Sequence, residues 1–316
     1  MDTIYLHHPI EANTLKIRPT VLALGYFDGV HLGHQEVINQ AIKKAAELGV
    51  QVAVMTFDPH PKEVLRKNAE PMRYITPLPQ KEKKIAELNV DVLYVVNFTK
   101  EFATLTPQQY VDQYIIALGA VHVVAGFDFT YGALGKGTME TLMFHSRGEF
   151  EQTTVQKVEQ GDVKISSTKI RELLETGEVS TIPAYLGEHY AIFGKVVDGD
   201  KRGRTIGFPT ANVEPTDRAK LLKTGVYAVR FETDNASYKG VCNVGYKPTF
   251  NELRPDIPTI EVHIFDFDGD LYGQEVTVYF EQTIRPEQKF SSKDELIKQI
   301  HADKQVAFAY FAEKSK

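Results

Sequence analysis

Short apolar runs alternate with helical repeats through the first half of the chain. The helical repeats are clearest in Gln35–Leu48 and Gln80–Leu88, and Thr106–Gln109 has the hydroxyl cap, proline and glutamine of a further helix start. Four apolar runs have the character of strands buried on both faces: Thr20–Phe27, Val50–Phe57, Val90–Asn97 and Val121–Gly126. Strands that alternate with helices at this spacing predict an α/β domain with a parallel sheet and right-handed crossovers.

The pattern changes past residue 185, where turn residues separate runs of β-forming residues. Five such runs follow one another: Tyr190–Val197, Gly225–Thr233, Ser237–Val244, Pro258–Phe267 and Gln274–Glu281. They predict an antiparallel sheet or small barrel, closed by a helix that begins with a capping sequence at Ser292. The join lies near Thr181–Glu188, so we expect two domains, residues 1–184 and 185–316.

Composition and charge narrow the class of protein. The chain has 316 residues, of which 42% are hydrophobic and 25% charged, as in ordinary globular proteins. Its net charge of −6 offers no broad basic surface for nucleic acid or an anionic membrane. The single cysteine, Cys242, excludes a disulfide framework and a CxxC zinc site. No apolar run reaches a membrane span and no signal-peptide pattern is present, so we expect a cytoplasmic protein without nucleic-acid, membrane or obligate protein partners.

A segment rich in glycine and histidine joins the first predicted strand to the first predicted helix. It reads GYFDGVHLGH over Gly25–His34. Ligands bind at the carboxyl edge of a parallel sheet, and unpaired N–H groups at a helix start suit phosphate. Two closely spaced imidazoles, His31 and His34, can donate hydrogen bonds to phosphoryl oxygens as charge develops. A His-x-x-His metal pair and a plain tight turn are the alternatives.

A second candidate anion site lies far downstream, at Ile165–Arg171. Its sequence, ISSTKIR, places three hydroxyls and two cations at the start of a predicted helix. Hydroxyls, cations and free N–H groups together bind anions well. An ordinary helix cap with exposed basic residues is the alternative.

The second half contains a loop with the character of a phosphate site. Gly199–Asn212 (GDKRGRTIGFPTAN) combines glycines and basic residues ahead of a rigid proline. Thr210 and Asn212 lie two residues apart in an extended segment, so they point to one side and offer the oxygen ligands that Mg²⁺ prefers. A hairpin of ordinary turn residues is the alternative for this loop.

Glu261 can supply a general base, which the phosphorylation of a hydroxyl requires. It lies in Thr259–His263, a run of alternating character that predicts a strand. Taken alone, a glutamate in a strand is more often a solvated surface residue.

These segments together resemble the bacterial bifunctional riboflavin kinase/FAD synthetases over nearly the whole chain. Besides the two candidate anion sites, three segments carry the resemblance in the first half: Thr56–Leu65, Asn97–Leu105 and Gly126–Gly132. In the second half it is carried by six more: Phe208–Asn212, Gly225–Ala228, Asn243–Phe250, Glu261–His263, Asp270–Gly273 and Arg285–Phe290.

The resemblance implies two activities in the order of the two domains. Residues 1–184 would form a Rossmann-like nucleotidyltransferase domain that transfers AMP from ATP to FMN, giving FAD and pyrophosphate. Residues 185–316 would form a small antiparallel barrel with a C-terminal helix that phosphorylates riboflavin with MgATP, giving FMN and ADP.

The resemblance also implies roles for individual residues. In the first domain, ATP would contact Gly25, Phe27, Asp28, Gly29, His31, Gly33, His34, Ser166, Ser167, Thr168 and Arg171, with both histidines acting on its phosphates. The flavin there would contact Pro59, His60, Asp128, Phe129 and Gly132. In the second domain, ATP would contact Gly199, Gly203, Arg204, Gly207, Pro209, Thr210 and Asn212, of which Thr210 and Asn212 would bind Mg²⁺. Glu261 would be the catalytic base, and the flavin would contact Arg285, Glu287, Phe290 and Ser291.

Three other functions compete with this interpretation. A chain in which only one domain is active would keep the other as scaffold, and a flavin-binding regulator would bind ligands without turnover. A regulator could lose Glu261, His31 or His34, and this chain keeps all three. An adenylyltransferase that modifies nucleic acid is disfavoured by the acidic charge of the chain.

Overall fold

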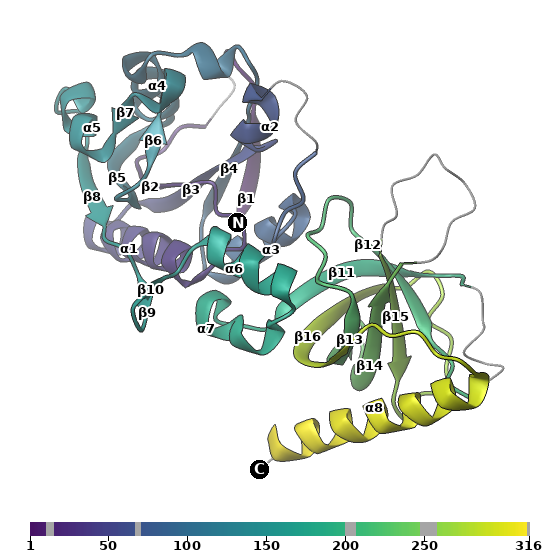
Figure 1. Cartoon of the computed structure of the whole chain (residues 1–316). Helices are drawn as coiled ribbons and strands as arrows, with labels where there is room; N and C mark the ends of the chain where they lie inside the picture. Colours follow the sequence, from purple (N-terminus) through teal and green to yellow (C-terminus); the bar gives the residue numbers. More distant parts are fainter. Residues whose placement is uncertain (11–15, 67–70, 200–206, 247–257, 315–316) are drawn as a thin grey trace. The chain divides into compact units, whose positions relative to one another are not determined.

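The computed structural model describes residues 1–10, 16–66, 71–199, 207–246 and 258–314 (Figure 1). They form two compact units, Met1–Ser167 and Thr168–Lys316. The boundary between the units falls at the start of helix α6 (Ser167–Thr176). All but the first residue of this helix belong to the second unit, and the helix is bonded to the segment that precedes β13 (Gly225–Glu232). There, the Leu174 carbonyl accepts from the Lys223 N–H at 2.9 Å, and Glu175 pairs with Lys220 at 2.7 Å. The expected domain boundary after residue 184 stays a prediction.

A six-stranded sheet forms the centre of the first unit, and all of its strands are parallel. Its order is β1-β4-β3-β2-β5-β8. The strands are β1 (Asp2–Leu6), β2 (Thr20–Leu24), β3 (Gln51–Asp58), β4 (Val92–Asn97), β5 (Ala120–Gly126) and β8 (Glu151–Val155). The predicted parallel sheet is therefore confirmed. The sequence pattern missed the two edge strands, β1 and β8, because their residues are mostly half-buried or exposed and form no continuous apolar run.

Helices cover both faces of this sheet (Figure 1). Val21 and Ala23 of β2 pack in one cluster with Ile38 of α1, whereas Leu22 and Leu24 pack in another with Tyr110 of α4. Burial on both faces explains the continuous apolar run of β2. The helices are α1 (Leu32–Leu48), α2 (Pro61–Leu65), α3 (Leu78–Glu87), α4 (Pro107–Tyr114) and α5 (Met139–Ser146). Two small hairpins complete the unit: β6 (Thr130–Tyr131) with β7 (Gly137–Thr138), and β9 (Glu159–Gln160) with β10 (Val163–Lys164).

The second unit is a closed antiparallel barrel with the strand order β11-β12-β15-β14-β13-β16. Its strands are β11 (Tyr190–Val197), β12 (Ala211–Pro215), β13 (Gly225–Glu232), β14 (Ser237–Gly245), β15 (Thr259–Ile264) and β16 (Glu275–Pro286). Five of them match the predicted strands, and the barrel confirms the predicted architecture. The short helix α7 (Pro183–Leu186) precedes the barrel.

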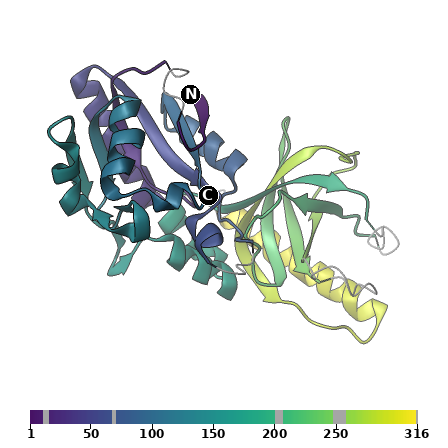
Figure 2. The ribbon, with the colours of Figure 1, turned by 90° about the horizontal axis from the view of Figure 1, so that it is seen from above.

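Helix α8 (Lys293–Lys314) closes the second unit and lies along the outside of the barrel (Figures 1 and 2). Its Ala307 and Phe311 pack against Ala228 of β13 and Phe265, which follows β15. The Ser292 hydroxyl accepts the Glu295 N–H at 3.2 Å, as the predicted helix start requires. The helix thus covers part of the outer face of the barrel.

Candidate functional sites

The loop between β2 and α1 lies at the carboxyl edge of the first unit's sheet, where parallel sheets bind ligands. Its backbone is tightly folded, because Phe27 and Val30 have φ angles of 56° and 45°. Non-glycine residues in this left-handed region are strained, and such strain concentrates at functional sites. A side chain at Gly25 would meet the Phe27 ring at 2.8 Å, so the fold requires glycine there.

The two histidines of this loop lie face to face, with ring centroids 3.5 Å apart. The Nδ1 atom of His31 accepts the His34 backbone N–H at 3.2 Å, so the proton of neutral His31 lies on Nε2. Burial lowers the pKa of His31 to about 4 and holds the pKa of His34 well below its usual value. Both imidazoles are therefore neutral at pH 7 and can donate hydrogen bonds without carrying charge.

Asp28 and Ser167 hold the loop in place. The carboxylate of Asp28 is buried and accepts the Thr76 N–H at 3.2 Å, while its carbonyl accepts from the Ser167 hydroxyl at 2.8 Å. The structure therefore brings the downstream Ser-Ser motif to the β2–α1 loop, as expected, through Ser167. Thr168 and Arg171 belong to the second unit, and their part in the nucleotide site stays a prediction.

Two neighbouring segments bring the predicted flavin residues of the first unit towards this loop. The ring of His60 lies 4.1 Å from that of Tyr26, which places the Pro59–His60 segment beside the loop. Asp128 pairs with Lys164 at 2.7 Å, and both of these charges act on the pKa of His31.

Phe129 and Gly132 pack against the protein itself. The ring of Phe129 stacks on that of Tyr131 at 6.2 Å. Gly132 has a φ angle of 70°, and a side chain there would meet the Pro107 nitrogen at 2.7 Å. Their flavin contacts stay predictions.

Sequence reasoning missed two lysines of this site. Lys164 is the partner of Asp128, and its ammonium nitrogen lies 4.7 Å from the centre of the Phe127 ring. Lys81 of α3 is buried, and it donates to the Tyr26 carbonyl at 2.9 Å. The only sequence signal for Lys81 was a charged residue on the apolar side of a helix, one turn before Ile85.

Glu261 lies on the outer face of the barrel in a row of polar residues. In the strand register it stands between Asn212 of β12 and Asn243 of β14. Its neighbours Ile260 and Val262 point into the barrel core, with exposures of 1% and 0%. Opposite residues on one sheet face have Cβ atoms about 5 Å apart, so the three polar side chains are neighbours. Asn243 was missed as a candidate, although its place between the buried residues Cys242 and Val244 could have marked it.

The segment before β12 lies against this row. A side chain at Gly199 would meet the Asn212 carboxamide at 2.1 Å, so these residues are in contact. The Pro209 carbonyl, one residue before Thr210, accepts from Nδ1 of His263 at 2.9 Å. Gly207 has a φ angle of 84°, which favours glycine. Gly203 and Arg204 lie outside the described residues.

The donor atoms near Glu261 suit a magnesium–nucleotide complex. Thr210 and Asn212 offer a hydroxyl and a carboxamide oxygen, and Mg²⁺ prefers oxygen ligands with phosphates completing its shell. Within the described ranges, no cluster of three or more His, Cys, Asp or Glu residues could hold a metal by itself.

Of the four predicted flavin residues of the second unit, Arg285 lies near the end of β16, and Glu287, Phe290 and Ser291 lie between β16 and α8. Arg285 forms a two-pronged ion pair with Asp303 of α8, with contacts of 2.9 and 2.8 Å, and its guanidinium lies 5.6 Å from the Phe290 ring. A side chain at Gly245 would meet the Glu287 carboxylate at 2.8 Å and the Asn243 carboxamide at 3.2 Å, which brings Glu287 to the polar row. Ser291 donates its hydroxyl to Glu295 at 2.7 Å.

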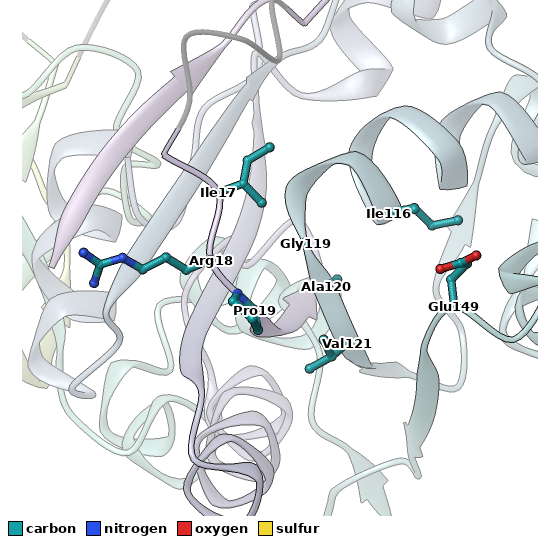
Figure 3. Close-up of a pocket in the computed structure, with 8 residues that line it drawn as sticks. All are labelled: Ile17, Arg18, Pro19, Ile116, Gly119, Ala120, Val121 and Glu149. Carbon is teal, nitrogen blue, oxygen red and sulfur yellow. The ribbon is translucent and has the colours of Figure 1, made fainter.

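A shallow pocket of about 280 Å³ lies at the opposite edge of the first unit's sheet (Figure 3). It is lined where β2 and β5 begin, by Pro19, Ala120 and Val121 among others, with Arg18 and Glu149 at its sides. This position is far from the carboxyl edge of the sheet, so the pocket is separate from the β2–α1 loop.

Comparisons with known proteins agree with the two-unit organisation. The FAD synthetase family model matches residues 14–169, and the riboflavin kinase family model matches residues 186–311. The bifunctional riboflavin kinase/FMN adenylyltransferase of Bacillus subtilis is 50% identical, and that of Listeria monocytogenes is 46% identical, each alignment covering 99% of both chains.

A solved structure shares the fold over nearly the whole chain. It is a crystal structure described as a macrolide-efflux protein from Streptococcus pneumoniae, with a TM-score of 0.89 and 36% identity over 97% of this chain and 99% of that one. In the part of this chain that the structure describes, no helix has the length and apolar character to cross a membrane. The family models and the full-length relatives show that the chain belongs to the bifunctional riboflavin kinase/FMN adenylyltransferase family, with an FAD synthetase domain followed by a riboflavin kinase domain.

Proposed function

We propose that the two units divide the two reactions of the family between them. The second unit phosphorylates riboflavin with MgATP, giving FMN and ADP, and the first unit transfers AMP from ATP to FMN, giving FAD and pyrophosphate. The observation that carries this division is the contrast between the two sites. The site of the first unit presents neutral hydrogen-bond donors on the β2–α1 loop. The site of the second unit presents the Glu261 carboxylate between two asparagine side chains.

Adenylyl transfer suits the β2–α1 loop because this reaction needs no strong protein base. The attacking group is the phosphate of FMN, which is already largely ionised near neutral pH. His31 donates from Nε2 to the phosphates of ATP, His34 lies beside it, and Ser167 and Asp28 keep the loop in shape. These donors are held in place before the substrate arrives, which is the arrangement that stabilises developing charge. Ser166, Thr168 and Arg171 complete the phosphate site in this proposal.

Riboflavin phosphorylation suits the polar row on the barrel. The attacking group is a neutral alcohol, and Glu261 accepts its proton. Thr210 and Asn212 hold the Mg²⁺ of MgATP, and bound Mg²⁺ supplies charge neutralisation on the phosphates. The Pro209 carbonyl, held by His263, fixes the backbone next to Thr210. Arg285, Glu287, Phe290 and Ser291 form the flavin side.

We further propose that both reactions occur in the cytoplasm and use only small molecules as partners. The acidic chain and its lack of a basic stripe support this. Under this proposal, flavins and ATP are the ligands of both units, and neither nucleic acid nor a membrane takes part.

The time course of flavin conversion tests the proposed function. Purified full-length protein is incubated with riboflavin, MgATP and a pyrophosphatase, and riboflavin, FMN and FAD are separated by chromatography. We expect FMN to appear first and FAD to follow. FMN without FAD would limit catalysis to the second unit, and flavin binding without ATP consumption would support a regulator instead.

A further inference from the structure

Lys81 is a buried cation directly behind the β2–α1 loop. Lys81 lies on α3, one turn before Ile85, which packs in the same apolar cluster as Val21 of β2. Only 3% of Lys81 is exposed. Buried lysines are rare because an ammonium group loses its hydration. A cation kept in such a place needs a reason other than solubility or surface charge.

The Lys81 ammonium and the Thr56 hydroxyl both donate hydrogen bonds to the same backbone carbonyl, that of Tyr26. Lys81 Nζ donates to the Tyr26 carbonyl at 2.9 Å and to Thr56 Oγ1 at 3.3 Å, and Thr56 itself donates to the Tyr26 carbonyl at 2.7 Å. Two donors on one carbonyl fix the plane of the Tyr26–Phe27 peptide. The Lys81 Nζ also lies 4.3 Å from the centre of the Tyr26 ring, which adds a cation–π contact.

The orientation of this peptide decides where the Phe27 N–H points. In a trans peptide the N–H is directed opposite to the carbonyl, so the Phe27 N–H faces away from Lys81 and Thr56. In the described part of the chain this N–H has no acceptor, and Phe27 has the left-handed φ of 56°. A fixed N–H without an acceptor, in the loop that also carries the two histidines, is suited to a phosphate oxygen.

The charge of Lys81 also reaches the histidines. No carboxylate of the described residues forms an ion pair with it, although Asp28 and Asp58 lie close enough to act on its pKa. Burial nevertheless lowers that pKa to about 8. After burial and the charge of His31, the charge of Lys81 is a further cause that lowers the pKa of His34. The ammonium thus adds to the effect of burial on the pKa of His34, while it lacks an ion-pair partner among the described residues.

We propose that Lys81 is a positioning residue of the adenylyl-transfer site, which sets the Tyr26–Phe27 peptide so that its N–H and the two histidines face the phosphates of ATP. The incoming phosphates supply the negative charge that the protein leaves unpaired. The proposal rests on the proposed role of the first unit. It assigns to α3, which carries none of the predicted site residues, a part in FAD synthesis.

Replacing Lys81 with methionine tests the proposal, because methionine keeps an unbranched apolar side chain and removes the ammonium. In K81M we expect kcat for FAD formation from FMN and MgATP to fall about 100-fold, as when a preorganised donor is lost. The KM for ATP should change less than kcat, and riboflavin phosphorylation by the same preparation should stay within twofold. K83M is the matched control, since Lys83 is an exposed lysine on the same helix and should keep both activities.

A second variant separates the ammonium group from simple packing. K81A leaves a space, and we expect propylammonium, but not propanol, to restore at least tenfold of the lost FAD formation. Should K81M form FAD within threefold of the wild-type rate, the proposal is wrong. Loss of both activities with a lowered melting temperature in K81M, and no propylammonium rescue in K81A, would show a purely structural lysine. Failure of the wild-type protein to form FAD would instead overturn the proposed function of the first unit.

Discussion

The two candidate sites differ in the chemical groups that they present to a phosphate-containing substrate. The first unit presents a strained loop at the edge of a parallel sheet, where two buried imidazoles stay neutral. The second presents Glu261 on the outer face of a closed barrel, flanked by two asparagines. Under the proposed division, the difference suits the attacking group of each reaction, since an ionised phosphate needs only donors for developing charge, whereas an alcohol needs a base.

The supports of the two sites also differ. In the first unit, the site depends on the shape of the β2–α1 loop backbone. Hydrogen bonds of Asp28, Ser167 and Lys81 hold this backbone in place. In the second unit, the strand register itself places the side chains, and the buried pair of Arg285 and Asp303 fastens α8 to β16. Changes in one support should therefore leave the other reaction intact.

The sharpest separation of the two sites comes from E261Q. Without the carboxylate no base accepts the proton of the alcohol, so FMN formation should fall about 1000-fold. Conversion of added FMN to FAD should remain near the wild-type rate. Both rates are measured on one preparation, with E275Q, a change at an exposed glutamate of β16, as the control. Equal loss of both rates in folded E261Q would contradict the division.

Breaking the ion pair between Arg285 and Asp303 should weaken the second unit alone. The Asp303 side chain is 3% exposed and that of Arg285 is 16% exposed, so D303N leaves a largely buried guanidinium without its carboxylate. Removing one partner of such a pair costs about 3 to 5 kcal/mol in the free energy of unfolding. Denaturant unfolding with separate probes for each unit measures this, and D294N at an exposed position of α8 should change little. An unchanged barrel would mean that the pair does not fasten the helix.

Acid should destabilise the first unit through His31. His31 has a pKa of about 4 in the folded state and about 6.5 when unfolded, so only the unfolded state takes up a proton between these values. Its contribution to stability is therefore complete above pH 6.5 and is lost as the pH falls towards 4. The loss is on the order of 3 kcal/mol. Unfolding curves from pH 7 to 4 measure it, and H31Q should show a shallower dependence.

The neutral donor of His31 can be tested by a pair of substitutions. H31A removes the donor and should lower FAD formation about 100-fold. H31Q keeps an N–H donor of similar reach and should retain more activity than H31A, while both variants phosphorylate riboflavin normally. Steady-state rates for the two reactions decide this. If H31Q and H31A were equally impaired, a simple donor role would not describe His31.

The smallest expected effect belongs to Asn243. Its side chain stands beside Glu261 in the strand register, so N243A should remove a polar neighbour of the base. We expect the rate of FMN formation to fall about tenfold, which corresponds to about 1.4 kcal/mol in the activation barrier. N235A, at an exposed turn before β14, is the control. A rate within twofold of wild type would limit the site to Glu261 and its partners on β12.

Most strands of both units could be predicted from the local sequence pattern. The apolar runs predicted four central strands of the parallel sheet and five strands of the barrel, because continuous or alternating burial leaves a direct pattern. The edge strands Asp2–Leu6 and Glu151–Val155 and the barrel strand Ala211–Pro215 were missed. The two edge strands are too exposed to show such a pattern, and the start of the barrel strand was interpreted as part of a phosphate loop.

The sequence by itself determined the family resemblance and the candidate residues for its chemistry, since His31, His34, Thr210, Asn212 and Glu261 lie in recognisable local motifs. Only the tertiary structure decided which residues support them. Lys81 meets Tyr26 across 55 positions, Ser167 meets Asp28 across 139, and Asn243 joins Glu261 through strand pairing. Contacts between residues so far apart depend on chain topology and packing, and no local pattern of apolar and polar residues encodes them.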